Sequence, residues 1–251
     1  MVILFFVFLL FFVIIVRFST RQRESLSVPD TAVTVVVCNY KRPHNLEKSL
    51  PILAEYPEIT EIIVSHNLKE NYREFSFPKV KNVTNYRLND QFGSTSRYFA
   101  AVSALSPWIL FLDDDHLPSR ALIQNLMRKM EENPVGLYGP YTRLCNERGY
   151  FQLLLWLRGG YNAVLTPILM TSKPILDRFL QNFHRYASFL EQTKGNGEDL
   201  AFNHHLMQEF GIQAERVKGS FKTLDEDTGS YRGRASHYKV RNRFCREFHG
   251  R

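Results

Sequence analysis

The stretch Trp108-Ile109-Leu110-Phe111-Leu112-Asp113-Asp114-Asp115 joins an apolar run to three successive carboxylates. An uninterrupted apolar run is typical of a strand that is buried on both faces of a parallel sheet. Ligands of open α/β sheets bind at the carboxyl ends of the strands, so we expect the three aspartates at the functional edge. Adjacent carboxylates repel one another and need a cation or hydrogen-bond donors to remain ionised. Mg²⁺ or Mn²⁺, shared with a substrate diphosphate, meets that need.

The residues before this stretch predict the rest of a parallel sheet. Apolar and β-branched runs indicate three more strands, at Thr31–Cys38, Glu61–His66 and Val80–Tyr86. Helices are expected between the strands, near His44–Glu55 and Ser94–Leu105. Such β-α-β alternation predicts an α/β sheet with right-handed crossover connections.

The residues after the aspartates are less regular. The expected elements are a helix at 118–132, a strand at 135–138, strands with a mobile loop at 142–166, and helices at 174–190 and 198–210. The tail from Val217 is basic and rich in Gly and Ser. Because no linker is long enough to divide the chain, we expect one domain over residues 31–251.

The composition excludes several classes of protein. The chain has 251 residues, of which 44% are hydrophobic and 23% charged, as in globular proteins rather than disordered or collagen-like chains. Its net charge of +7 suits a nucleic acid, a membrane surface or a phosphorylated small molecule. We expect no nucleic-acid partner. Binding a nucleic acid would require the basic residues to gather in one stripe on the surface, which makes it the least favoured of the three. Three cysteines are too few, and odd in number, for a disulfide framework.

The N-terminus carries an uninterrupted apolar run from Val2 to Val16. As a helix this run spans about 22 Å, and snorkelling of Arg17 extends it toward the thickness of a bilayer. No cleavage site follows it. We therefore expect an uncleaved membrane anchor at residues 1–18 and a short polar stem at residues 19–30.

Two signals disagree on the orientation of this anchor. Arg17, Arg21 and Arg23 follow it, which favours a cytosolic catalytic domain under the positive-inside rule. The acceptor sequon Asn82-Val83-Thr84 favours a lumenal domain. Both orientations therefore stay open at this point.

A second pair of carboxylates, Glu198 and Asp199, begins a predicted helix. We expect Asn196 to cap this helix and the two acids to complement its dipole. The same side chains can project into a site while they do so. A further acidic cluster, Asp225-Glu226-Asp227, is expected to be a solvated loop because no buried strand leads to it.

Three residues that often carry chemistry are expected to be structural here. His204 and His205 are neighbours in the predicted helix, so they point to different faces and are poor joint metal ligands. Cys38 lies in a buried strand and is expected to be inert. The tyrosines between Tyr138 and Tyr161 are expected in the core.

Taken together, the motifs resemble nucleotide-sugar glycosyltransferases of the GT-A fold, and specifically the exostosin family. The resemblance covers most of residues 32–248. It rests, in chain order, on Asn39-Tyr40-Lys41-Arg42, Ser96-Arg97-Tyr98-Phe99, Asp113-Asp114-Asp115, Val135-Gly136, Tyr161-Asn162-Ala163-Val164-Leu165, Asn196-Gly197-Glu198-Asp199, Arg234-Ala235-Ser236-His237 and Arg241. The implied fold is a Rossmann-like mixed sheet flanked by helices, in a single domain.

The resemblance also implies roles for individual residues. Contacts with the donor nucleotide would come from Arg42, Asn67 and Arg97. Asp113 and Asp114 would bind hydroxyl groups of the ribose and the sugar, and Asp115 would hold Mn²⁺ or Mg²⁺ against the diphosphate. Either Glu198 or Asp199 would lie beside the anomeric carbon. Arg241 would stabilise the departing diphosphate, with Arg243 as the alternative.

The function implied is metal-dependent transfer of a sugar from a UDP-sugar to a glycan or glycoconjugate, with retention and hence an α-linkage. The cation and an arginine would stabilise the charge that develops on the diphosphate. The alternative is a catalytically inactive nucleotide- or carbohydrate-binding module of the same fold. A third possibility is another metal-dependent enzyme, such as a nucleotidyltransferase, which would release pyrophosphate rather than UDP.

One departure from the family concerns the cysteines and the compartment. The family commonly has a Cys just before the acidic pair, bonded to another Cys near the C-terminus. Gly197 stands at that position here, so Cys245 is expected to lack its partner. The resemblance implies a Golgi or ER lumen, whereas the flanking arginines and the missing cysteine favour the cytosol.

Overall fold

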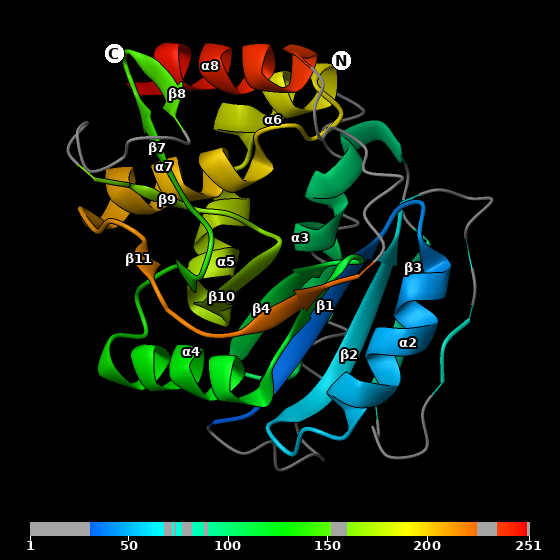
Figure 1. Ribbon diagram of the computed structural model, residues 1–251. Helices are drawn as coiled ribbons and strands as arrows, with labels where there is room; N and C mark the ends of the chain where they lie inside the picture. The colour runs from blue at the N-terminus through cyan, green and yellow to red at the C-terminus, as the bar shows by residue number, and fades with distance from the viewer. Residues whose placement is uncertain are drawn as a thin grey trace.

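The computed structural model describes residues 31–67, 72, 74–76, 82–87, 90–151, 160–224 and 235–249. Within them a seven-stranded sheet runs through the molecule in the order β11-β6-β10-β4-β1-β2-β3 (Figure 1). Helices lie against this sheet on both sides. The prediction of a mixed α/β sheet flanked by helices is confirmed.

Four parallel strands form one half of the sheet. They are β1 (Val33–Asn39), β2 (Ile59–His66), β3 (Asn82–Arg87) and β4 (Trp108–Asp113). β1 pairs with β2 and with β4, and β2 pairs with β3, all in parallel. All residues of β1 are buried, as its β-branched sequence predicts. This arrangement brings the carboxyl ends of β1 and β4 together, with Cys38 opposite Asp113.

The other half of the sheet contains antiparallel pairing. β10 (Ile168–Ser172) pairs antiparallel with both β4 and β6 (Tyr138–Gly139), and β11 (Glu215–Arg216) pairs parallel with β6. The sequence did not predict β10. The single helix expected at 174–190 is two helices, α5 (Lys173–Gln181) and α6 (His184–Gln192).

The two faces of the sheet have separate hydrophobic cores. Val35 and Val37 of β1 pack with α2 (Pro43–Ala54) and α4 (Arg120–Glu132) on one face. Val36 packs on the other face, where α3 (Ser96–Ala100), α5, α6 and α7 (Glu198–Phe210) lie. Two 3₁₀ segments, η3 (Asp90–Thr95) and η4 (Ala101–Ser103), flank α3. The side chains of β1 thus alternate between the two cores, as the period of a strand requires.

Two smaller sheets and a C-terminal helix complete the described part of the molecule. β12 (Phe221–Thr223) pairs with β5 (His116–Pro118). β7 (Thr142–Asn146) pairs with both β8 (Gly149–Phe151) and β9 (Ala163–Val164). The basic tail contains α8 (Ala235–His249), a helix that the sequence did not predict. Its Arg241, Phe244 and Cys245 are buried, while its other residues carry most of its positive charge outside the core.

A disulfide joins Cys145 of β7 to Cys245 of α8. The expectation that Cys245 lacks a partner is therefore wrong, and the argument against an oxidising compartment that rested on it falls. The two cysteines are 100 residues apart in the chain, so only the docking of α8 against β7 and β8 brings them together. Cys38 is free and buried.

The expected membrane anchor at residues 1–18 and stem at residues 19–30 lie outside the described residues, as do Asp225–Asp227 and Arg234. Among the helices that the structure describes, none combines the length and apolar character that a membrane span requires.

Candidate active site

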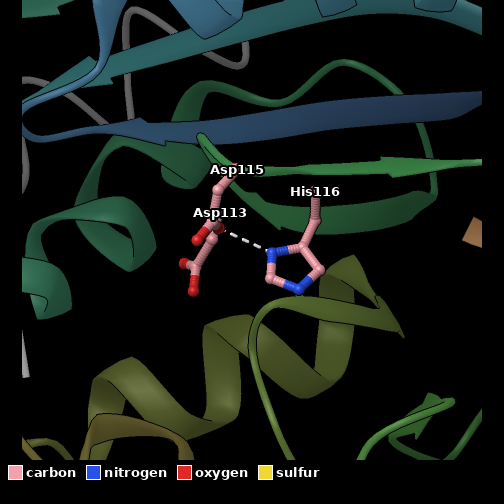
Figure 2. A group of neighbouring side chains, drawn as sticks. All are labelled: Asp113, Asp115 and His116. Carbon is pink, nitrogen blue, oxygen red and sulfur yellow. Dashed lines mark hydrogen bonds and ion pairs between the residues drawn. The ribbon is translucent and has the colours of Figure 1, made fainter. Parts of the chain in front are cut away.

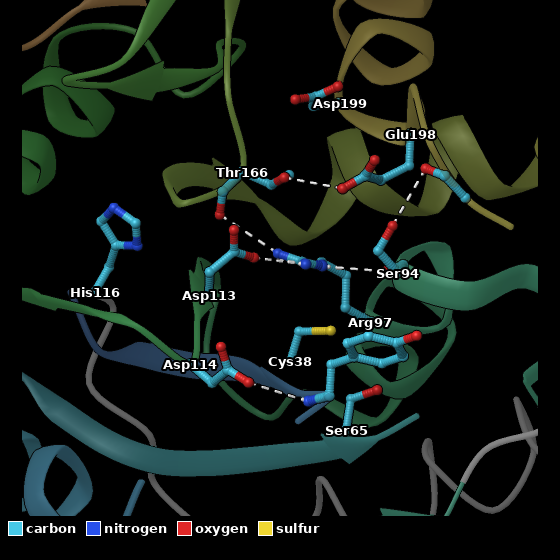
Figure 3. A network of polar contacts seen from close by, with 12 residues as sticks. Cys38, Ser65, Ser94, Arg97, Asp113, Asp114, His116, Thr166, Glu198 and Asp199 are labelled. Carbon is cyan, nitrogen blue, oxygen red and sulfur yellow. Dashed lines mark hydrogen bonds and ion pairs between the residues drawn. The ribbon is translucent and has the colours of Figure 1, made fainter. Parts of the chain in front are cut away.

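A cavity of about 480 Å³ opens at the carboxyl ends of β1 and β4. The nine residues that the sequence singled out all line it, although they come from distant parts of the chain: Arg42, Asn67, Arg97, Asp113, Asp114, Asp115, Glu198, Asp199 and Arg241. Figure 3 shows most of its carboxylates gathered between β4 and the start of α7. The chain therefore places these groups in one cavity, where the strand-end argument predicts a ligand site.

Asp114 is the most buried of the three aspartates, at 3% exposure. The Arg42 guanidinium contacts its Oδ1 through Nη2 at 2.6 Å and Nε at 2.9 Å, and the Tyr40 backbone N–H donates to its Oδ2 at 3.2 Å. Burial raises the pKa of Asp114, and the charge of Arg42 opposes that rise. Asp114 thus ties the loop after β1 to the end of β4, and both of its oxygens are engaged.

Asp113 lies at the other side of the strand end and is the more accessible carboxylate. Arg97 donates through Nη2 to Asp113 Oδ1 at 2.7 Å (Figure 3). The Arg97 side chain is held by the backbone carbonyls of Ser94, at 3.1 Å, and Thr166, at 3.4 Å. The Asp113 side chain keeps 30% exposure, against 3% for that of Arg97. Asp113 can therefore face a ligand while Arg97 holds it from behind.

Asp115 lies between a cationic and an imidazole neighbour. Its Oδ2 contacts Arg42 Nη1 at 2.8 Å, and its Oδ1 lies 2.6 Å from His116 Nδ1. Burial would raise the pKa of Asp115, but the hydrogen bond from His116 and the charges of His116 and Arg42 outweigh it, so the pKa is lowered. Asp115 is therefore ionised over the whole neutral range.

Asp113, Asp115 and His116 together form a group that could hold a metal ion. One ligand atom from each residue lies within 4.8 Å of the others. Figure 2 shows the His116 ring beside the two carboxylates at the end of β4. Two carboxylate oxygens and an imidazole nitrogen suit Mn²⁺ and related divalent cations. The sequence analysis missed His116, although its place directly after the three aspartates was a usable signal.

Glu198 and Asp199 begin α7, and they have different partners. Asp199 is paired with Arg241, whose Nη2 contacts both carboxylate oxygens. Glu198 accepts a hydrogen bond from Thr166 Oγ1 at 3.0 Å (Figure 3). Burial first, and the Asp199 charge next, raise the pKa of Glu198 to about 7. The two neighbouring acids are thus chemically distinct, one ion-paired and one titrating near neutrality.

The start of α7 differs from the expected cap. The residue before the helix is Gly197, with φ 112°, and no side chain caps the first turn. Asn196 instead donates to the His237 carbonyl at 3.4 Å. The prediction that Asn196 caps the helix is wrong. A positive φ at Gly197 is readily adopted by glycine, and it turns both acids into the cavity.

Arg241 lines the cavity, and Arg243 does not. Arg241 lies over the Tyr150 ring at 4.8 Å, and its side chain is 6% exposed. Its Nε has no hydrogen-bond partner among the described residues. Arg243, two residues along α8, lies over Phe189 and contacts Glu247 at 3.6 Å. Of the two arginines that the sequence left open, only Arg241 is positioned to meet a ligand in the cavity.

Asn67 and Cys38 occupy the floor of the cavity. The Asn67 amide donates to Cys38 Sγ at 3.1 Å and to the Gly93 carbonyl at 3.0 Å, and it accepts from Ser96 Oγ at 2.6 Å. Burial raises the pKa of Cys38 to about 12, so its thiol stays protonated, as its expected inertness requires. The Asn67 side chain is committed to this network and shapes the floor.

The far end of the cavity is lined by five residues to which the sequence assigned no role in the site, although His237 belongs to a motif that carries the family resemblance. They are Tyr141, Arg143, Tyr150, His237 and Tyr238. They come from β7, β8, α8 and the residues next to them, which have no hydrophobic periodicity that would have marked them as a site. Aromatic faces and a guanidinium offer contacts that the strand-end residues lack.

The family model described as "Glycosyl transferase family 2" matches residues 34–191, well over half of the chain. The match begins in β1, includes the three aspartates of the cavity and ends within α6. No curated protein matches the chain.

Proposed function

The chain belongs to glycosyl transferase family 2 and is a glycosyltransferase of the GT-A fold, and on that premise we propose its donor, metal and mechanism. The donor is a UDP-sugar, the acceptor is a glycan or glycoconjugate, and the cofactor is Mn²⁺ or Mg²⁺. The observation that carries this proposal is the single cavity in which three strand-end aspartates meet the Glu198, Asp199 and Arg241 group.

The donor set at the end of β4 fits a divalent cation. Asp115, with Asp113 and His116 beside it, supplies oxygen and nitrogen donors within 4.8 Å of one another. A bound cation would supply charge stabilisation to the diphosphate of the donor. His116 and Arg42 lower the pKa of Asp115 and so keep it ionised, and Arg42 holds its Oδ2.

Arg241 is proposed to stabilise the diphosphate as the bond to the sugar breaks. Its guanidinium is buried in the cavity, and its Nε has no partner among the described residues. Charge-assisted hydrogen bonds to a phosphate are stronger than neutral ones, and they strengthen as negative charge develops. Asp199 holds Arg241 in place, so the pair acts as one unit.

We propose transfer with retention, giving an α-linkage, as the resemblance to the exostosin family implies. Asp199 or Glu198 then stabilises the positive charge that develops at the anomeric carbon. One observation favours inversion as the second candidate. The pKa of Glu198 is raised to about 7, which suits a base that takes the acceptor hydroxyl proton at neutral pH.

A lumenal location is proposed for the catalytic domain, behind an N-terminal anchor at residues 1–18. The Cys145–Cys245 disulfide supports it, because such bonds form and persist in oxidising compartments. The sequon at Asn82 points the same way. We give the disulfide and the sequon more weight than the arginines after the anchor, because charges next to a single anchor bias its orientation without fixing it.

The proposal is tested by incubating the purified chain with Mn²⁺ and a panel of UDP-sugars, and measuring UDP release with and without sugar acceptors. Release of UDP from one donor, with an acceptor-dependent product, is the expected result. The anomeric configuration of that product, read by NMR, decides between retention and inversion. Tight UDP binding with no turnover for any donor would instead identify an inactive binding module, and release of pyrophosphate would identify a nucleotidyltransferase.

A further inference from the structure

The charged groups at the end of β4 leave few carboxylate oxygens for a cation. Both oxygens of Asp114 are engaged, by Arg42 and by the Tyr40 backbone. Arg42 also takes Asp115 Oδ2, and Arg97 contacts Asp113 Oδ1. Three aspartates therefore present less negative charge to the cavity than their number suggests. A cation held by Asp113 and Asp115 alone would have a weak site.

Of Asp113, Asp115 and His116, only His116 offers a nitrogen atom as a ligand. Its Nδ1 lies 2.6 Å from Asp115 Oδ1, on the side where the ligand atoms of Asp113 and Asp115 converge (Figure 2). Its Nε2 lies 2.8 Å from the Tyr141 hydroxyl, on the opposite side of the ring. A histidine that binds a metal commonly has its second ring nitrogen held by a hydrogen bond in this way.

Packing fixes the orientation of the His116 ring. The ring meets the edge or face of Tyr141 at 5.3 Å and of Phe221 at 6.0 Å between centroids. Its backbone is held by the pairing of β5 with β12. The side chain is 5% exposed, so the ring has no room to turn into solvent. Nδ1 is thus held toward the carboxylates before any cation arrives.

We propose that His116 is a direct ligand of the cation through Nδ1, with its ring proton on Nε2 facing the Tyr141 hydroxyl, and that it makes this site select Mn²⁺ over Mg²⁺. This inference rests on the proposed function, since it assigns a ligand to the proposed metal. Mn²⁺ shares the preference of Mg²⁺ and Ca²⁺ for oxygen ligands, but as a first-row transition metal it also accepts an imidazole nitrogen, which the harder Mg²⁺ and Ca²⁺ disfavour. The competing reading is that His116 only donates a hydrogen bond to Asp115 and never contacts the cation.

Pulsed EPR of Mn²⁺ bound to the full chain in the presence of UDP distinguishes the two readings. A directly bound imidazole gives ¹⁴N couplings to the Mn²⁺ electron spin, and ¹⁵N-histidine labelling should replace them with ¹⁵N couplings without any mutation. His116→Gln should abolish the couplings, whereas His184→Gln, at an exposed position of α6, should leave them intact. Bound Mn²⁺ without histidine couplings, or couplings that survive in His116→Gln, would overturn the proposal.

Affinities supply the second measurement. Calorimetry should show that His116→Gln weakens Mn²⁺ binding by at least the roughly 10–100-fold that loss of an outer-shell partner costs, and weakens Mg²⁺ binding by much less, so that the preference for Mn²⁺ falls. Equal losses for both cations would contradict a ligand role for the imidazole. Normal Mn²⁺ binding and normal UDP release without nitrogen couplings would contradict the ligand role of His116 and leave the proposed function standing. An absence of Mn²⁺ binding would overturn the proposed metal dependence as well.

Discussion

At the scale of single residues, the carboxylates of the cavity differ in the partners that hold them. Arg42 neutralises Asp114, Arg97 holds Asp113 and Arg241 holds Asp199. Within the part of the chain that the structure describes, Glu198 accepts from the Thr166 hydroxyl and forms no ion pair. Burial, and next the charge of Asp199, raise the pKa of Glu198 to about 7 against the opposing charges of Arg97 and Arg241.

The stability of variants should follow these partners. Asp199→Asn leaves the Arg241 guanidinium buried without its counter-ion, and we expect a loss of about 3–5 kcal/mol in the free energy of unfolding. Glu198→Gln keeps an oxygen that can accept from Thr166, so its loss should be below about 1 kcal/mol. Denaturant titrations at pH 7 measure both values. An unstable Glu198→Gln beside a stable Asp199→Asn would show that the pairs are wrongly assigned.

His204 and His205 should make the fold sensitive to acid. Burial lowers the pKa of each to about 4, while an unfolded histidine titrates near 6.5. Between these values the unfolded chain binds protons that the folded chain excludes. Stability is therefore full above pH 6.5 and falls as the pH drops toward 4, by up to about 1.4 kcal/mol per pH unit for each histidine.

Thermal unfolding between pH 7.5 and pH 4 checks this pH dependence. His205 has no hydrogen-bond partner for either ring nitrogen among the described residues, so His205→Leu should keep its stability at neutral pH and lose less of it in acid. His184→Ala, at an exposed site, serves as the control. A pH profile unchanged in His205→Leu would contradict the assigned role of His205.

At the scale of helices and strands, the sequence predicted what hydrophobic patterning encodes. The continuous apolar runs of β1, β2 and β4 identified buried parallel strands, and α7 has the bounds that were expected, 198–210. β10 was missed because periodicity cannot distinguish an apolar run as short as Ile168-Leu169-Met170 from a short piece of buried helix. α8 escaped because its many basic residues hide the narrow apolar stripe that contains Phe244.

The candidate site follows the same division. Motifs adjacent to recognisable elements were found, as with the three aspartates after β4 and the acids at the start of α7. The sequence left open whether Arg241 or Arg243 faces the ligand, because only the docking of α8 decides it. The Cys145–Cys245 bond and the far end of the cavity, with Tyr150 and Tyr238, depend on the same docking of α8. No local sequence pattern predicts that docking.

The disulfide that ties α8 to β7 should matter for both stability and turnover. Replacing Cys145 and Cys245 together by Ser should lower the free energy of unfolding by about 2–5 kcal/mol. Because α8 carries Arg241, kcat should fall more than UDP affinity. Alkylation and mass spectrometry of the unfolded wild type should label Cys38 alone before reduction and all three cysteines afterwards. Three labelled cysteines without reductant would show that the bond does not form.

At the scale of the whole molecule, the cavity draws on both ends of the described chain. Arg42 follows the first strand, and Arg241 belongs to the last helix, yet both line the same site. The family match ends at residue 191, before α7 and α8. The segment beyond the match therefore contributes Glu198, Asp199 and Arg241, and the matched residues alone do not complete the cavity.

The central claim is that this cavity binds the diphosphate of a nucleotide sugar through a divalent cation at Asp115. Calorimetric titration of UDP tests it most directly, because it needs neither the donor sugar nor the acceptor. The wild type is compared with Asp115→Asn and with Glu132→Gln, an exposed carboxylate on α4 that serves as the matched control. Thermal unfolding of each variant confirms that it is folded.

We predict that UDP binds the wild type and Glu132→Gln only when Mn²⁺ is present, and that Asp115→Asn loses at least about tenfold in that Mn²⁺-dependent affinity. UDP binding that is equally tight in a chelator, or unchanged in a folded Asp115→Asn variant, would contradict the account.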